Sequence, residues 1–173
     1  MCMKAANRRS DSFEEMRTYW ELKERGRTGL VEQDTIRLLR ECDAGVKMGI
    51  SSIGDVLDYV KSDSLKQKLT DCKRDHERLE QELRTLLNRY QDEGKEPNPM
   101  AKGMSWIKTN VKLAVNESDG TIADLMTDGC DMGVKSLSKY LNQYQAADET
   151  SKNLAKRLIR LEEQLAAELR TFL

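Results

Sequence analysis

An internal repeat is the feature of this sequence that most constrains its fold. Residues 42–47 (CDAGVK) recur as residues 130–135 (CDMGVK), and residues 82–87 (ELRTLL) recur as residues 168–173 (ELRTFL). Five of the six residues are identical in each pair, and the two offsets, 88 and 86 positions, are nearly equal. Repeated segments in the same order indicate a repeated structural unit. The sequence therefore predicts two copies of one unit, over residues 35–87 and 121–173.

Each predicted unit is a pair of helices. Beginning at Leu65, apolar positions alternate strictly by four and three residues, which is typical of a helix packed in a bundle. This stripe consists of Leu65, Leu69, Cys72, His76, Leu79, Leu83 and Leu86. Similar patterns predict long helices over residues 31–60, 65–92, 121–146 and 148–173. The short polar residues at 62–64 and Asp148 are expected to cap helix starts, because their oxygens can accept hydrogen bonds from free backbone amides.

The predicted fold is all-α, with two helical hairpins that close into a four-helix bundle. The hairpins cover residues 31–93 and 121–173, and a crossover over residues 94–120 joins them. Neither hairpin can bury its apolar side alone, so the two are expected to pack together. Within the crossover, Asn98 and Pro99 suit the start of a helix over residues 99–115, which contains no acidic residue.

Residues 1–30 form a predicted N-terminal arm outside the repeat. Apolar residues spaced by three and four positions indicate a short amphipathic helix over residues 12–25. They are Phe13, Met16 and Trp20. Gly26 and Gly29 are expected to end this helix. Because aromatic side chains are common anchors of interfaces, the arm is the expected contact with a second copy of the chain or with a protein partner, or it docks on its own bundle.

The repeat places a glycine in the middle of two predicted helices. Gly45 and Gly133 occupy matching positions. A glycine inside a helix costs about 1 kcal/mol relative to alanine. The recurrence therefore predicts a close approach of the first and third bundle helices at these positions.

Two hairpins joined by one long crossover resemble the ferritin-like superfamily, and the local sequence is similar to small bacterial ferritin-like proteins. The segments that carry the resemblance are 38–46 (LLRECDAGV), 74–77 (RDHE), 129–137 (GCDMGVKSL) and 157–163 (RLIRLEE). The resemblance covers residues 35–173 and implies a ferritin-like four-helix bundle.

The resemblance also implies where a metal site would lie. Iron-handling members hold two metals between single glutamates from two helices and a Glu-x-x-His motif from each of the other two. Here the second helix has Lys-x-x-His at 73–76 and the fourth has Ile-x-x-Glu at 159–162, while Cys42 and Cys130 take the places of the single glutamates. The carboxylate set that bridges two irons is therefore incomplete, and di-iron oxygen chemistry is not expected.

A different alignment of the first and third helices with the iron-handling pattern would change which of their residues stand at the ligand positions. It would place Glu41 or Asp43 on the first helix, and Asp131 on the third, where the single glutamates belong. The carboxylate set remains incomplete in this register as well.

His76, the only histidine, is the central candidate site residue because it lies on an apolar stripe. A buried imidazole needs hydrogen-bond partners, and Glu162, at the matching position of the other hairpin, is the expected one. This pair is interpreted as a structural hydrogen bond. The alternatives are a residual acid–base site, a residual metal site with His76, Glu162, Cys42 and Cys130 as ligands, and a zinc site that uses His76 with the thiols of Cys42, Cys72 and Cys130.

The composition excludes several classes of function. The net charge is −1, from 29 basic and 30 acidic residues, which does not favour nucleic acid. There is no run of about 18 apolar residues, so no membrane span is expected. The cysteines are widely spaced and are read as thiols of a cytoplasmic protein.

The function that these patterns favour is a non-catalytic structural or interaction module with a degraded di-metal site and no cofactor. One alternative is a metal-binding or metal-dependent redox protein that uses iron, manganese or zinc. The other is a peripheral membrane or stress-associated protein that uses the basic amphipathic segment 99–115.

Overall fold

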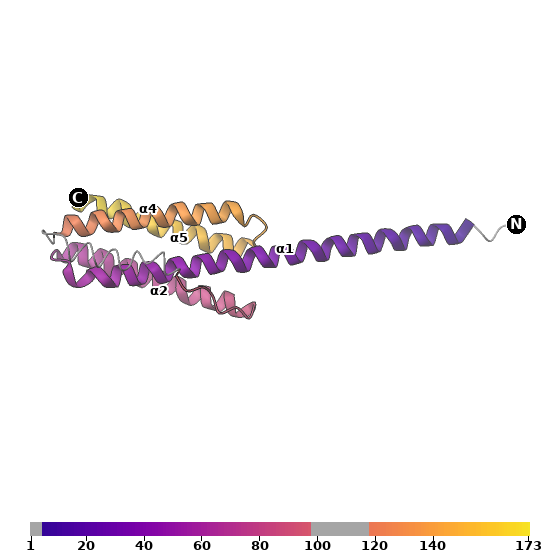
Figure 1. Cartoon of the computed structure of the whole chain (residues 1–173), viewed down its shortest axis with the longest axis horizontal. Coiled ribbons are helices and arrows are strands. Elements are labelled where there is room, and N and C mark those ends of the chain that lie inside the picture. The colour runs from indigo at the N-terminus through magenta and orange to yellow at the C-terminus, as the bar shows by residue number, and fades with distance from the viewer. Residues whose placement is uncertain (1–4, 98–117) are drawn as a thin grey trace.

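The computed structural model describes residues 5–97 and 118–173, and of residues 5–15 it describes the backbone alone. These residues form the helices α1 (Ala5–Val56), α2 (Asp63–Arg89), α4 (Asp119–Gln143) and α5 (Glu149–Leu169), and the 3-10 turns η1 (Leu57–Tyr59) and η3 (Arg170–Phe172) (Figure 1). The described ranges contain no β-strand. The prediction of an all-α protein with four main helices is thereby confirmed. The predicted helix over residues 99–115 lies outside the described residues.

The first helix is longer than the sequence predicts. α1 runs without interruption through Gly26 and Gly29, so the prediction of a short helix over residues 12–25 that ends at these glycines is wrong. A glycine ends a helix by adopting a positive φ, and among the described glycines only Gly94 does so. Inside a helix a glycine costs only about 1 kcal/mol, which is too little to interrupt α1.

Residues 5–30 of α1 form an arm that projects from one end of the bundle, as Figure 1 shows. Every side chain from residue 16 to residue 30 is exposed. The first buried side chains of α1 are those of Asp34 and Thr35, where the helix enters the bundle. The arm and the bundle therefore share one continuous helix.

The bundle buries two apolar clusters. The arm-side cluster consists of Leu38, Leu39, Cys42, Val46, Leu79, Leu83, Leu87, Leu137, Tyr144, Ala147, Leu154, Ala155 and Leu158. The far cluster consists of Ile53, Val56, Leu65, Leu69, Cys72, Ile122, Ala123, Met126, Cys130, Leu165, Ala166 and Leu169. All four helices contribute to both clusters. The predicted stripe of α2 is buried as expected, except that Leu87 takes the core position assigned to Leu86, which is half-buried.

The order in which each helix passes the two clusters gives the chain directions. α1 and α5 run from the arm-side cluster to the far cluster, and α2 and α4 run in the opposite direction. α2 therefore ends at the arm side, while α4 begins at the far side (Figure 1).

Each hairpin turn is held by the other hairpin. At the far end, the carboxylate of Asp119 accepts hydrogen bonds from the backbone amides of Lys61 and Ser62, both at 2.8 Å. At the arm side, Asp34 accepts from the amide of Ala146 at 3.1 Å, and the Thr35 hydroxyl accepts from the amide of Asp148 at 2.9 Å. These contacts satisfy backbone amides of each turn with side chains of the other hairpin.

The helix starts are capped as the sequence predicts. The Ser62 hydroxyl accepts from the amide of Leu65 at 3.3 Å, and the Asp148 carboxylate accepts from the amide of Ser151 at 2.7 Å. Each bond satisfies one of the free amides of a helix start.

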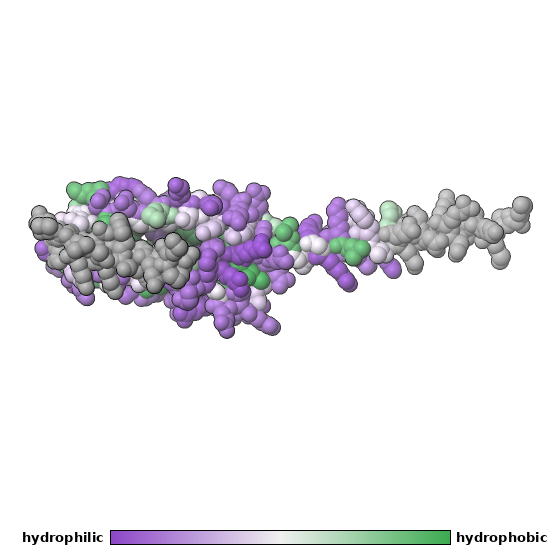
Figure 2. Space-filling view, in the orientation of Figure 1, coloured by the Kyte–Doolittle hydropathy of each residue, from purple (hydrophilic) through white to green (hydrophobic). Residues whose placement is uncertain are grey.

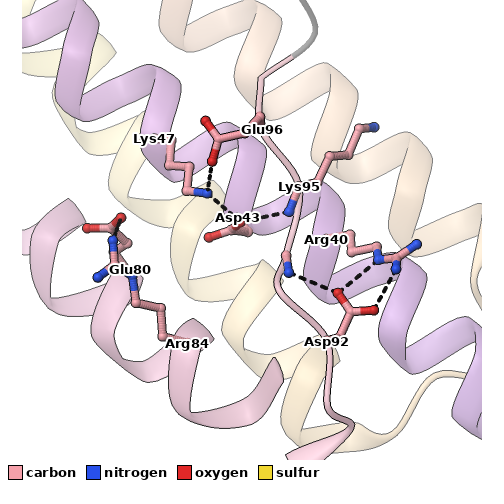
Figure 3. A network of polar contacts seen from close by, with 9 residues as sticks. Arg40, Asp43, Lys47, Glu80, Arg84, Asp92, Lys95 and Glu96 are labelled. Atoms are coloured by element: carbon pink, nitrogen blue, oxygen red, sulfur yellow. Dashed lines mark hydrogen bonds and ion pairs between the residues drawn. The ribbon is translucent and has the colours of Figure 1, made fainter. Parts of the chain in front are cut away.

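The segment that follows α2, residues 92–96, lies across α1 and is called the strap (Figure 3). Arg40 of α1 binds Asp92 through two hydrogen bonds, of 2.9 and 2.6 Å. Asp43, only 1% exposed, accepts a hydrogen bond from the backbone amide of Lys95 at 2.9 Å. Buried charges in proteins are normally paired. These contacts fix the first residues of the crossover against α1.

Two further features hold the strap. Gly94 has a φ of +84° and lies so close to the carboxylate of Asp43 that a side chain at this position would collide with it. Lys47 of α1 pairs with Asp43 at 3.1 Å and with Glu96 at 2.5 Å. The left-handed backbone is accessible to glycine at no steric cost, so the strap depends on glycine here.

We expect Asp43→Asn to lower the free energy of unfolding by about 1–3 kcal/mol, because it removes the charged acceptor of the Lys95 amide and leaves Lys47 with Glu96 as its anionic partner. Trypsin is expected to cut after Lys95 faster in this variant. The matched control is Asp131→Asn at the repeat-related position, where the carboxylate is exposed and pairs with Arg170 at 3.3 Å. Equal effects of the two substitutions on unfolding would contradict the role assigned to Asp43.

Candidate functional site

A polar layer lies between the two apolar clusters. It consists of Gly49 of α1, His76 of α2, Gly133 of α4 and Glu162 of α5, and we call it the central layer. On each helix these residues fall between members of the arm-side cluster and members of the far cluster. The bundle therefore places its one histidine and a glutamate where a layer of apolar side chains would otherwise continue.

His76 is saturated with hydrogen bonds. Its side chain is 0% exposed, its Nδ1 lies 3.0 Å from the backbone carbonyl oxygen of Cys72, and its Nε2 lies 3.0 Å from Oε1 of Glu162. The predicted partnership of His76 with Glu162 is confirmed. The repeat offset of 86 residues identified the glutamate from the other hairpin.

The pair shares a proton. A carbonyl oxygen can only accept, so Nδ1 of His76 carries a hydrogen and donates to Cys72. The contact between Nε2 and Glu162 then needs one more hydrogen, on either the imidazole or the carboxyl group. Burial lowers the pKa of His76, but the side-chain hydrogen bonds to the Cys72 sulfur and to Glu162, together with the charge of Glu162, outweigh burial and raise the pKa to about 10. The folded chain therefore holds this proton at neutral pH.

The stability of the protein is expected to fall as the pH rises from 6.5 to 8.5. The ordinary pKa of histidine is 6.5, and the folded value is about 10. Between these values the folded state keeps a proton that the unfolded chain has lost, so the free energy of unfolding decreases by at most about 1.4 kcal/mol per pH unit. This stabilisation is fully present below pH 6.5 and is lost as the pH rises through 10.

Urea unfolding at several pH values checks this expectation, within a range below the ionisation of unfolded thiols near about pH 8.5. The double variant His76→Leu/Glu162→Met lacks both titrating groups and serves as the control. Its pH profile should be flatter. Parallel profiles for the two proteins would show that the pair does not hold the proton.

Gly49 makes room for the imidazole. A Cβ added at Gly49 would lie 2.7 Å from Nε2 and 2.8 Å from Cδ2 of His76, which is shorter than any ordinary contact. At Gly133, a Cβ would lie 3.5 Å from the carboxyl carbon of Glu162, an ordinary contact distance. Gly49 was not singled out from the sequence, because no signal in a single chain shows which level of α1 faces His76.

The repeated glycines do not act as predicted. An added Cβ at Gly45 would meet the Leu158 side chain of α5 at 3.8 Å, and one at Gly133 would meet Glu162, also of α5. The prediction that these glycines mark a close approach of the first and third bundle helices is therefore wrong. The neighbour in both cases is a side chain of the fourth helix, and it leaves room for a methyl group.

Two cysteines flank the pair, and one does not. Cys72 has its Sγ 3.5 Å from Nδ1 of His76. Burial, followed by the charge of Glu162 and a hydrogen bond to it, raises the pKa of Cys130. Cys42 belongs to the arm-side cluster, seven residues before Gly49, which is roughly 10 Å along the helix axis. Burial, then Glu41 and Asp43, raises the pKa of Cys42 to about 12.

The predicted metal ligands are only partly brought together. His76, Glu162 and Cys130 are neighbours, but Cys42 lies about two turns away, so it does not share a site with them. Both imidazole nitrogens already have partners. Within residues 16–97 and 118–173, no three His, Cys, Asp or Glu side chains converge as metal ligands. Among the described residues, the ligands of a di-metal centre are therefore not assembled.

The arm carries a second candidate surface. Its large apolar side chains are more than half exposed, at Met16 (53%), Tyr19 (61%), Trp20 (54%), Leu22 (64%) and Leu30 (53%). Figure 2 shows apolar patches along the arm, separated by hydrophilic surface. The Lys23 ammonium lies 5.0 Å from the centre of the Trp20 ring. These exposed apolar side chains make the arm the second candidate for a functional surface among the described residues.

Comparison of the chain with protein-family models, curated proteins and solved structures finds no match in any of the three. The geometry described above is therefore the basis on which a function can be proposed.

Proposed function

We propose that this protein is a non-catalytic interaction module, in which the bundle is a rigid base and the arm of α1 is the contact element. The observation that carries the proposal is the arm itself. A helix of 26 residues leaves the bundle in continuous register and exposes five large apolar side chains. Exposed aromatic and apolar residues on a rigid element are the usual anchors of protein interfaces.

The central layer supports the non-catalytic part of the proposal. His76 is buried and uses both nitrogens for structural hydrogen bonds, so neither is free to take a proton from a substrate. Buried polar pairs in helical bundles can specify which packing is adopted. We infer that the layer serves this purpose here and that the two hairpins arose by duplication of one ancestral hairpin in a ferritin-like arrangement.

Photo-cross-linking in the producing cells tests the role of the arm. A photoreactive phenylalanine analogue is placed at Trp20 or Leu30, and matched controls carry it at Gln81 or Lys156, which are exposed on the bundle. Discrete protein adducts are expected from the arm positions only. No adduct from the arm, or equal adducts from the bundle positions, would overturn the proposed interaction role.

Elemental analysis tests the alternative of a metal-binding or redox protein. The purified protein is dialysed with iron, manganese or zinc, and we expect no stoichiometric retention. About one metal per chain that is lost in His76→Ala would replace the proposal with the metal-dependent alternative. The membrane alternative rests on residues 99–115, outside the described residues, and none of the described helices is long and apolar enough to cross a membrane.

A further inference from the structure

One face of the arm has the spacing of a coiled coil. Met16, Trp20, Lys23, Arg27 and Leu30 follow one another at intervals of four, three, four and three residues, and all lie on exposed helix. This spacing is that of the contact positions of two supercoiled helices. We call these five residues the arm stripe. Leu22 is also exposed but lies outside this spacing.

The arm needs a partner along its length. At 1.5 Å per residue the arm extends roughly 40 Å from the bundle. It contains Gly26 and Gly29, where a Cβ added to the backbone would meet no neighbouring atom within 4 Å. A single helix of this kind is marginally stable in water, since most helical stability comes from packing of an apolar face. An occupant that runs beside the arm would supply that packing.

We propose that this occupant is the arm of a second copy of the chain, antiparallel to the first and centred between Glu21 and Leu22. This inference rests on the proposed function and names the partner. In this register Trp20 lies opposite Lys23 of the second copy, and Met16 lies opposite Arg27 of the second copy.

The charges of the arm stripe select this direction. In a parallel pair Lys23 would face Lys23 and Arg27 would face Arg27, so two successive layers would each hold two like charges. In the antiparallel pair each cation faces an apolar or aromatic side chain. Lys23 already lies over Trp20 within one chain, and a cation over an aromatic ring is attracted to it. The alkyl stem of Arg27 can cover Met16 while its charged end reaches water.

The two edges of the stripe are complementary in the same register. On one edge Arg17 lies beside Glu24 of the second copy. By the two-fold symmetry of the pair, Glu24 of the first copy lies beside Arg17 of the second. Both residues are well exposed, and each forms an ion pair within its own helix, Arg17 with Glu21 at 3.8 Å and Glu24 with Arg27 at 2.9 Å. On the other edge Tyr19 lies beside the open space at Gly26 of the second copy.

Sedimentation of the purified full chain over a range of concentrations tests the pairing. We expect a dimer whose dissociation constant rises at least about thirtyfold in Trp20→Ala, the loss typical of a buried aromatic anchor. The matched control Leu22→Ala removes an even more exposed apolar side chain outside the stripe and should have no effect. A monomer at all concentrations, or equal effects of the two variants, would overturn the inference.

Charge exchange tests the register. Arg17→Glu and Glu24→Arg are each expected to weaken the dimer about tenfold, because each creates two pairs of like charges. The double variant Arg17→Glu/Glu24→Arg restores both pairs with their signs exchanged and should recover the affinity. Additive weakening in the double variant would exclude this register. Circular dichroism of each variant confirms that the helices are kept.

Spin labels test the direction. In a Cys2→Ser background, a label is placed at Arg25 or at Glu32, both on the side of the helix away from the stripe. The antiparallel pair separates the two labels along the axis by roughly 10 Å at position 25 and roughly 32 Å at position 32. Equal distances at the two positions would show a parallel pair and overturn the proposal.

The two proposals fail separately. A monomeric purified chain whose arm cross-links to other proteins in cells would overturn the second copy as partner and keep the interaction role. An arm that gives no adduct of any kind would remove both. Adducts with the mass of two chains, lost in Trp20→Ala, would support both.

Discussion

Replacing Glu162 with alanine is expected to lower the free energy of unfolding by about 3–5 kcal/mol, the usual result of removing one member of a buried charged pair. The variant leaves Nε2 of His76 without a partner at a position that is 0% exposed. It also opens a space next to Gly133, whose nearest neighbours are the side-chain atoms of Glu162. Urea unfolding at pH 7 measures the effect, and His76→Ala should give a loss of similar size.

The control for this prediction replaces both members. Exchanging a buried ion pair for apolar residues of similar volume is often neutral or stabilising by about 1–4 kcal/mol. His76→Leu/Glu162→Met is therefore expected to be at least as stable as the unmodified protein. A double variant as unstable as Glu162→Ala would mean that the pair makes a net favourable contribution, and the specificity role proposed for the layer would lose its support.

Gly49→Ala is expected to destabilise the bundle although alanine is the better helix former. The new methyl group would lie 2.7 Å from an imidazole that two hydrogen bonds hold in place, so the ring or the helix has to move. Overpacking of a core costs about 1–3 kcal/mol, which exceeds the gain of about 1 kcal/mol in helix propensity. Urea unfolding measures the net loss, and the NMR signals of the His76 ring report the displacement.

The matched control is Gly45→Ala, one helical turn away on the same helix. Its methyl group would meet Leu158 at an ordinary 3.8 Å, so the gain in helix propensity should remain and stabilise the protein by up to about 1 kcal/mol. Opposite signs for the two substitutions are the expected result. If both variants are stabilised, the space around His76 is larger than the contacts of Gly49 indicate.

The pairing of His76 with Glu162 could be predicted because it depends on the repeat. Two similar hairpins that pack together place equivalent positions at the same level, so the offset of 86 residues led directly to the glutamate. Capping at Ser62 and Asp148 was predictable for a local reason, since a side chain and an amide three residues later determine it.

The continuity of the arm with the first bundle helix could not be predicted in the same way. Gly26 and Gly29 have a preference to end helices, but that preference is worth only about 1 kcal/mol and α1 continues through both. The two repeat segments match in sequence, but this match did not predict which contacts each segment makes. Asp43 and Asp131 match in sequence, yet Asp43 is buried under the strap while Asp131 is exposed beside Arg170. The strap that follows the first hairpin covers Asp43.

The sequence by itself determined the presence of four bundle helices, the caps at Ser62 and Asp148, the apolar stripes and the partner of His76, because these follow from spacing along one chain and from the repeat. The tertiary structure alone decided that Gly49 holds the space for the imidazole, that Cys42 lies outside the central layer, and that Asp43 anchors the strap. These depend on the relative height and rotation of neighbouring helices. Many side-chain contacts across the bundle together determine the height and rotation of each helix, and no local sequence pattern specifies these two quantities.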